Sequence, residues 1–246
     1  EPGNPKLDLN GFDAFAKVRI LSALSFNNLI SKNDCIMEVS RRSMVAPQPI
    51  LIIACGALSK EIATLVRVNR WEHLRLTCLD AELHNRPELI APKLRAKIIK
   101  FRELYEHIFV AYGDCGSGGE IDQVILEFNI ERLPGVHCYS FLAGEDIFDE
   151  IASEELGTFF LTDFLAEHFD RLVMTGLKIG EYPELRDQYF RHYKRLVYIS
   201  QTPDDRLLHL AEDAANKLAL NFEHRPCGSG PLMSHLKAQI LKFASS

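Results

Sequence analysis

Three cysteines of this chain stand where chemistry could take place. Cys55, Cys115 and Cys138 each follow a short run of apolar or small residues, and glycine or other loop-forming residues lie close by. If those runs are parallel strands, all three thiols lie at the carboxyl edge of one sheet, where open α/β sheets bind their ligands. A thiol at that edge can ligate a soft metal ion or act as a nucleophile, whereas a cysteine within a strand is usually a small core residue.

Two histidines accompany these thiols. His137 directly precedes Cys138, and His84 lies on a polar segment after a further candidate strand. Thiolates and imidazoles are the ligands that zinc prefers, and a catalytic zinc leaves one position open beside three protein ligands. No Cys-x-x-Cys pair is present to clamp a metal locally. The alternative is that two or three of these cysteines are ordinary buried residues.

A glycine-rich segment surrounds Cys115. Residues 112–120 read Tyr-Gly-Asp-Cys-Gly-Ser-Gly-Gly-Glu between a predicted strand and a predicted helix. Such a segment can present free backbone amides to an anion, although it matches neither the Walker loop nor the Gly-x-Gly-x-x-Gly fingerprint. A flexible strand-to-helix connection is the alternative. The predicted substrate- or anion-binding residues here are Gly113, Gly116, Ser117 and Gly118, and Arg86 and His137 complete the predicted set.

Two other polar segments carry weaker signals. Residues 80–87 include His84 and Arg86, which could bind substrate or metal, although an ordinary turn and helix start explains the local sequence better. Thr162 or Asp163 could bind a ligand, but capping of the following helix is the favoured interpretation. No motif of serine hydrolysis or phosphoryl transfer is present.

Apolar periodicity predicts alternating strands and helices from residue 49 onward. The fold class is therefore α/β, with a mostly parallel, Rossmann-like sheet flanked by helices. We expect an extension over residues 1–43 and an α/β domain over 44–246, which could divide near 161–180 into two similar halves. Strands are predicted at 50–54, 74–79, 108–111, 159–161 and 196–199 and from 222, and helices at 57–69, 87–107, 121–128, 146–153, 163–171, 182–194, 204–220 and 232–243.

Composition narrows the class of protein. The net charge of −6 argues against a nucleic-acid-binding surface. The longest apolar stretch is too short to span a bilayer, so no membrane association is expected. Six cysteines in 246 residues, without the dense spacing of secreted scaffolds, are typical of reduced thiols. The expected location is the cytoplasm.

Several motifs, in this order, resemble the domain-of-unknown-function 1638 family over about residues 49–240. The resemblance implies that Cys55, His84, Cys115 and Cys138 are the family's motif residues and form a Cys/His metal site. Two departures leave the substrate contacts open: His137 stands where the family has an acidic residue, and Asp163-Phe164-Leu165 replaces an aromatic segment. The motifs are Ile-Ile-Ala-Cys-Gly-Ala-Leu (52–58), Leu-His-Asn-Arg-Pro-Glu (83–88), Tyr-Gly-Asp-Cys-Gly (112–116), His-Cys-Tyr-Ser-Phe-Leu-Ala-Gly (137–144), Gly-Thr-Phe-Phe-Leu-Thr (157–162) and the segment 189–199.

The family is encoded beside corrinoid-dependent methyltransferases, which implies a role in one-carbon metabolism. The expected cofactor is zinc or iron, with a corrinoid supplied by a partner, either a corrinoid protein or a corrinoid methyltransferase. Three functions follow. The protein could be a metal-dependent methyltransferase or methyltransferase accessory, a non-catalytic carrier of a corrinoid or metal, or a metal-free enzyme with a reactive cysteine.

Overall fold

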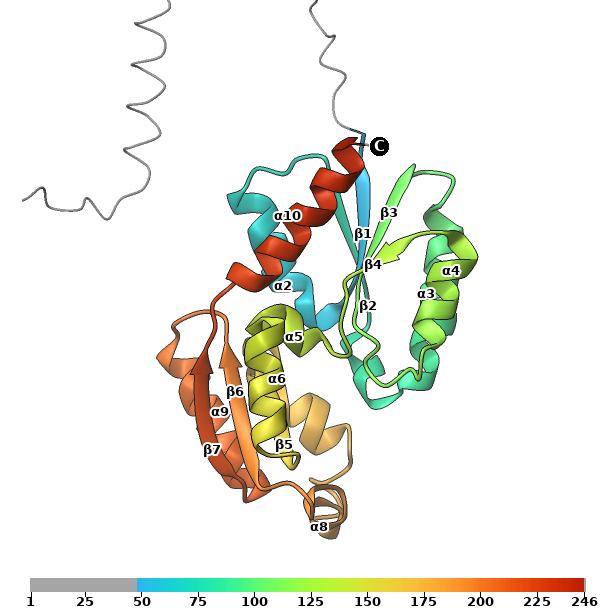
Figure 1. Ribbon diagram of the computed structural model, residues 1–246. Coiled ribbons are helices and arrows are strands. Elements are labelled where there is room, and N and C mark those ends of the chain that lie inside the picture. Colours follow the sequence, from blue (N-terminus) through green and yellow to red (C-terminus); the bar gives the residue numbers. More distant parts are fainter. Residues whose placement is uncertain (1–47, 246) are drawn as a thin grey trace, which may run out of the picture. The chain divides into compact units, whose positions relative to one another are not determined.

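The strands of residues 48–245, the part of the chain that the structure describes, form two parallel sheets in the computed structural model (Figure 1). The first sheet has the order β2-β1-β3-β4 and the second the order β5-β6-β7. The first contains β1 (Ile50–Cys55), β2 (Leu74–Leu79), β3 (His107–Ala111) and β4 (Glu131–Arg132), and the second contains β5 (Thr158–Thr162), β6 (Arg195–Ser200) and β7 (Asn221–Pro226).

Helices connect the parallel strands, as crossover connections require. The expected α/β class with parallel sheets flanked by helices is confirmed. The first part of the chain supplies η1 (Gly56–Leu58), α2 (Ser59–Val68), η2 (Ala81–Asn85), η3 (Pro87–Leu89), α3 (Ile90–Phe101), α4 (Glu120–Phe128), α5 (Cys138–Ala143) and α6 (Glu145–Glu154). The second part supplies α7 (Asp163–Glu167), the π-helix η4 (Asp170–Thr175), α8 (Glu184–Phe190), α9 (Asp205–Leu218) and α10 (Gly230–Ser245).

Strand β1 is the centre of the first sheet. All six of its residues are buried, because it pairs with β2 on one side and β3 on the other. The register aligns Cys55 with Leu79 and Ala54 with Ala111. The segments that follow these three strands therefore emerge at one carboxyl edge of the sheet, which is what the cysteine positions predicted for Cys55 and Cys115.

The change from one sheet to the other lies earlier than the expected subdivision near residues 161–180. Strand β4 ends at Arg132 and β5, the first strand of the second sheet, begins at Thr158. The last helix, α10, then returns to the first sheet, because its Leu232 and Leu236 are buried in the core that surrounds β1. The expected extension, residues 1–43, lies outside the described residues.

Three predicted helices have different bounds in the structure. The helix expected over 87–107 divides into η3 and α3, and the one over 163–171 becomes α7 followed by a π-helix. The one expected over 182–194 is limited to α8, because Pro183 precedes its first turn and the chain turns at Tyr193 before β6.

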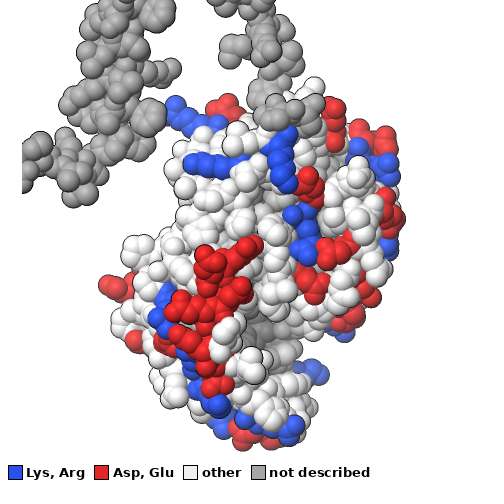
Figure 2. Space-filling view, in the orientation of Figure 1, with Lys and Arg blue, Asp and Glu red and all other residues white. Residues whose placement is uncertain are grey.

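Acidic side chains gather over α6 on the face that Figure 2 shows. The sequence of this helix contains no basic residue, and its carboxylates are Glu145, Asp146, Asp149, Glu150 and Glu154. Among residues 48–245, no helix combines the length and the apolar character needed to cross a membrane.

Candidate functional site

The three predicted thiols converge on one buried point. Cys55 is the last residue of β1, Cys115 lies in the loop after β3, and Cys138 is the first residue of α5. Their exposed fractions are 0%, 9% and 5%. The Sγ atoms of Cys115 and Cys138 are 3.3 Å apart, and all three cysteines are free. Three segments that are distant in sequence thus place three thiols together.

Cys138 occupies this point by a route that the sequence analysis did not predict. The strand before it, β4, ends at Arg132, because Pro134 cannot donate to a strand ladder and Gly135 has a φ of +111°. The chain turns instead, and α5 begins at Cys138. The position of Cys138 at the end of a strand was therefore a wrong prediction, although its proximity to Cys115 is confirmed by the structure.

Three groups flank Cys55. Hydrogen bonds from the Cys138 thiol, His84 and Tyr112 hold the pKa of Cys55 well below its usual value, against the effect of burial. The hydrogen bond to Cys55 in turn raises the pKa of His84. Burial and the neighbouring cysteines raise the pKa of Tyr112, so its hydroxyl stays protonated and can donate. The site therefore favours a thiolate at Cys55 beside an imidazolium at His84.

Cys115 is the second residue whose thiolate form is favoured. A hydrogen bond from Cys138 lowers the pKa of Cys115 from its usual 9.0 to about 5, and a further bond from His137 acts in the same direction. The pKa of Cys138 is raised by its bonds to Cys115 and Cys55 and by burial. Cys138 is thus the thiol that keeps its proton, and its single S–H can donate to one neighbouring thiolate at a time. A thiolate is the form that ligates metals and attacks electrophiles.

The backbone at Cys115 is held in an uncommon conformation. Its φ of +48° lies in the left-handed region, which residues other than glycine adopt at a cost. The Cys115 amide donates to the carbonyl of Val136 at 2.9 Å. Gly113 allows this approach, since an added Cβ would lie 2.9 Å from the Cα of His137. The loop after β3 and the turn before α5 are therefore fitted closely to each other.

Arg132 fixes the turn that leads to Cys138. Its guanidinium binds both carboxylate oxygens of Asp122, with Nε–Oδ1 at 2.5 Å and Nη2–Oδ2 at 3.1 Å. It also donates to the carbonyls of Leu133 and Gly135, at 2.7 and 3.1 Å. Four hydrogen bonds from one planar group leave this turn little freedom.

The predicted anion-binding loop already contains an acceptor of its own. The carboxylate of Asp114 accepts hydrogen bonds from Ser117 Oγ at 2.7 Å and from the amides of Gly118 and Gly119 at 3.2 and 2.8 Å. Gly116 and Gly118 have positive φ, as the turn requires. An external anion would have to compete with Asp114 for these donors. Anion binding by Gly113, Gly116, Ser117 and Gly118 stays a prediction.

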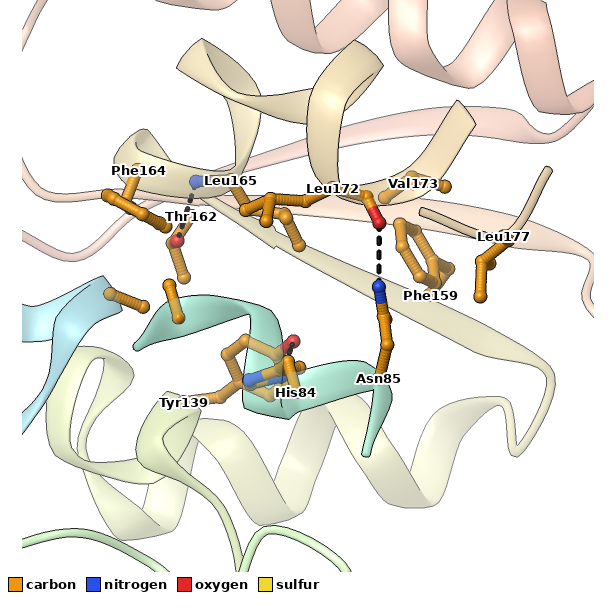
Figure 3. A pocket seen from close by; sticks show the side chains of 12 residues that line it. His84, Asn85, Tyr139, Phe159, Thr162, Phe164, Leu165, Leu172, Val173 and Leu177 are labelled. Carbon is orange, nitrogen blue, oxygen red and sulfur yellow. Dashed lines mark hydrogen bonds between the residues drawn. The ribbon is translucent and has the colours of Figure 1, made fainter. Parts of the chain in front are cut away.

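A cavity of about 90 Å³ has His84 in its wall (Figure 3). His84 Nε2 and the Tyr139 hydroxyl are 3.3 Å apart and line one wall. Leu172 and Val173 of the π-helix lie on the opposite wall. The remaining lining residues are Ala57, Ala81, Asn85, Phe159, Thr162, Phe164, Leu165 and Leu177, so the wall is mainly apolar.

Of the other predicted residues, only His137 contacts a thiol of this centre. His137 contacts Cys115 and stacks on Tyr139, with ring centroids 5.9 Å apart. Arg86 does not join the thiols and lines a separate groove. Thr162 caps α7, because its Oγ1 accepts from the Leu165 amide at 3.3 Å. Asp163 binds groups of its own sheet instead.

Two tyrosines belong to the site although the sequence analysis did not single them out. Tyr112 directly follows β3, so the rule that ligands bind beyond strand ends could have identified it. Tyr139 follows Cys138 and could have been identified only from its neighbour. Both supply hydroxyl groups to the cysteine–histidine centre.

The residues present suit a thiophilic metal ion by type, and their spacing needs adjustment. Within residues 48–245, no group of three His, Cys, Asp or Glu side chains is already spaced to hold a metal ion. Two thiolates on one tetrahedral zinc, with bonds of about 2.3 Å, lie about 3.8 Å apart. The observed separation of 3.3 Å between Cys115 and Cys138 is about half an ångström shorter than that. Small side-chain rotations would therefore suffice for this pair.

The family described as "Protein of unknown function (DUF1638)" matches residues 78–236, and the chain belongs to it. No curated protein matches the chain. Among solved structures, ornithine carbamoyltransferase from Pyrococcus furiosus aligns with 9% identity and a TM-score of 0.21. That alignment covers 72% of this chain, which spans 54% of the transferase.

Proposed function

We propose that this member of the DUF1638 family binds a thiophilic metal ion, zinc before iron, through Cys55, Cys115 and Cys138, with His84 as the fourth donor. One observation carries the proposal: three thiols from three distant segments meet at one buried point beside a histidine. Buried cysteines that only fill a core can lie far apart, whereas the cysteine ligands of one metal ion must lie close together.

The donor set also suits the metal electrostatically. Deprotonation of ligating thiols is part of metal binding, and the site already favours the thiolate at Cys55 and Cys115. His137 and Tyr112 contact these two thiols from outside the proposed ligand set and can orient them. A bound zinc would act as a Lewis acid at the edge of the cavity.

The proposed biological setting is corrinoid-linked methyl transfer in the cytoplasm. The family resemblance supports the link to corrinoid metabolism. The free thiols support the cytoplasm, because they suit a reducing compartment. A partner that carries the corrinoid would supply the methyl chemistry, and this protein would serve as a methyltransferase or its accessory. A non-catalytic carrier would bind the same metal or corrinoid without turnover.

Elemental analysis of protein purified without chelators tests metal binding. We expect stoichiometric zinc or iron in the unchanged chain and its loss in Cys55→Ser, Cys115→Ser and Cys138→Ser. Cys78→Ser and Cys227→Ser are matched controls, because these two cysteines are free and lie outside the cluster. A metal-free protein, or equal metal in all five variants, would refute the proposal.

A specific observation favours a second candidate, a metal-free enzyme with a reactive cysteine. Cys115 has a lowered pKa, and the protonated thiol of Cys138 lies 3.3 Å from it, which is the arrangement of a nucleophile and a resolving thiol. Alkylation by iodoacetamide of reduced, chelator-treated protein distinguishes the two. Selective modification of Cys115 that excess zinc does not slow would favour the reactive cysteine, whereas protection by zinc would favour the metal site.

A further inference from the structure

The cavity beside His84 adjoins a groove of opposite character. The two spaces share Asn85, Leu172 and Leu177 in their walls. The inner space has a mainly apolar wall, whereas three cationic side chains, Arg86, Arg171 and Lys178, line the outer one. A mainly apolar cavity thus lies next to a cationic groove.

Two of the three cations are available to a ligand. Arg171 is paired with Glu82, at 2.7 Å between Nη1 and Oε1. Within residues 48–245, neither Arg86 nor Lys178 has a carboxylate within ion-pair distance, and both are exposed. Because Glu82 is the only acidic residue in the groove wall, the groove keeps a net positive charge.

The wall between the two spaces is an irregular helix. Over Asp170–Thr175 the chain forms a π-helix, in which the Gly176 amide bonds to the carbonyl of Arg171 rather than to that of Leu172. The freed Leu172 carbonyl accepts a hydrogen bond from Asn85 Nδ2 at 2.9 Å, visible in Figure 3. Gly176 permits this contact, since an added Cβ would lie 2.7 Å from Asn85 Nδ2. Single π-turns of this kind occur often at binding sites.

We propose that the cavity and the groove form one binding site for a small amphipathic anion, with a short alkyl chain in the cavity and an anionic head group against Arg86 and Lys178. An alkyl chain suits the apolar wall of Leu172, Val173 and Phe159. The far end of that chain would lie beside His84 and Tyr139, which line the inner wall. That this anion is the substrate of the thiol centre rests on the function proposed above, whereas its binding does not.

Titration calorimetry with the straight-chain carboxylates from propionate to octanoate tests the site. Chelator-treated and zinc-loaded protein are measured separately, so a failure of metal binding does not hide ligand binding. We expect affinity to rise about fourfold with each CH₂ until the cavity is full and then to level off. The neutral amides of the same chain lengths should bind at least tenfold more weakly. Equal affinity for acids and amides, or no saturable binding of any chain length, would overturn the proposal.

Variants separate the two compartments. Arg86→Gln and Lys178→Gln should each weaken carboxylate binding about tenfold and leave amide binding unchanged, with Arg67→Gln and Lys237→Gln as exposed controls outside the groove. Leu177→Ala should shift the best chain to a longer one, because it enlarges the cavity. Leu220→Ala, a partly buried leucine elsewhere, should not. Circular dichroism confirms folding of each variant, and an unchanged chain-length preference in folded Leu177→Ala would contradict the placement of the alkyl chain.

Discussion

The carboxyl edges of the two sheets both carry buried ionisable groups, which differ in their hydrogen-bond donors. At the edge of the second sheet, the buried Asp163 accepts hydrogen bonds from the Tyr198 hydroxyl, the amides of Gln201 and Thr202, and the Thr202 hydroxyl, at 2.6 to 3.1 Å. At the edge of the first sheet, the buried thiols have mainly each other, His84 and Tyr112.

This difference separates a structural group from a candidate functional one. Every donor to Asp163 comes from β6 or the segment directly after it, so its charge is satisfied within one sheet. The thiolates at Cys55 and Cys115 instead both face the single S–H of Cys138, and their other partners, among them His84, come from separate segments. A buried charge with few donors is more open to a cation than a charge that four donors already satisfy.

The largest expected effect on stability comes from Asp163. Asp163→Ala should lower the free energy of unfolding by about 3 to 5 kcal/mol, because it leaves several buried donors without an acceptor. Urea unfolding measures the change, and Asp213→Ala, at an exposed position on α9, is the control. The same variant should keep its metal content. A loss below about 1 kcal/mol would show that Asp163 is not the structural group described here.

Substitution of a thiol, unlike that of Asp163, should reduce metal binding. Cys115→Ser is expected to lower zinc affinity at least about a hundredfold, which exceeds the usual cost of losing a group that only supports a ligand. Without metal, its stability should also fall, most at alkaline pH, because serine cannot supply the thiolate that the folded state stabilises. Competition with a chromophoric chelator measures the affinity, with Cys78→Ser as control. Unchanged zinc affinity would remove Cys115 from the proposed ligand set.

Stability of the metal-free protein should depend on pH through Cys115. Its pKa falls from 9.0 to about 5 on folding, so the unfolded chain binds more protons between these values and stability rises with pH there. This contribution is complete above the unfolded pKa and is lost as the pH falls through about 5. His84 has a pKa that is raised on folding. It therefore contributes stability that is complete below its unfolded pKa and is lost as the pH rises through its raised folded pKa.

Unfolding in urea across this range measures the dependence. The slope should diminish in Cys115→Ser, because that variant has no thiolate to stabilise at this position. Cys227→Ser should leave it unchanged. An equal slope in Cys115→Ser and the unchanged chain would contradict the stabilised thiolate.

Arg132 should have the smallest effect. Arg132→Lys replaces four fixed hydrogen bonds by a flexible ammonium group, so the turn before Cys138 gains freedom. We expect zinc affinity to fall about tenfold, as is usual for groups that support a ligand. Arg95→Lys, in an exposed pair with Glu127, is the matched control. An effect equal to that of Cys115→Ser would mean that the turn contributes more than positioning.

Strand-end reasoning identified part of the site because local patterns encode it. The buried run Ile50–Ala54 ends at Cys55, and glycines follow β3 around Cys115, so both positions could be predicted from the sequence. The helix at Cys138 could not, because the turn at Gly135 is fixed by Arg132 and by the contact of Val136 with Cys115. The cavity depends on residues from the segments of both sheets, such as His84 and Val173, whose proximity no local pattern records.

The most direct test of the central claim is X-ray absorption spectroscopy at the zinc edge of the loaded protein. We predict a shell of three sulfurs at about 2.3 Å with one nitrogen at about 2.0 to 2.1 Å, which Cys138→Ser reduces to two sulfurs. A shell of oxygen and nitrogen alone, or one that Cys138→Ser leaves unchanged, would contradict a metal centre at these thiols.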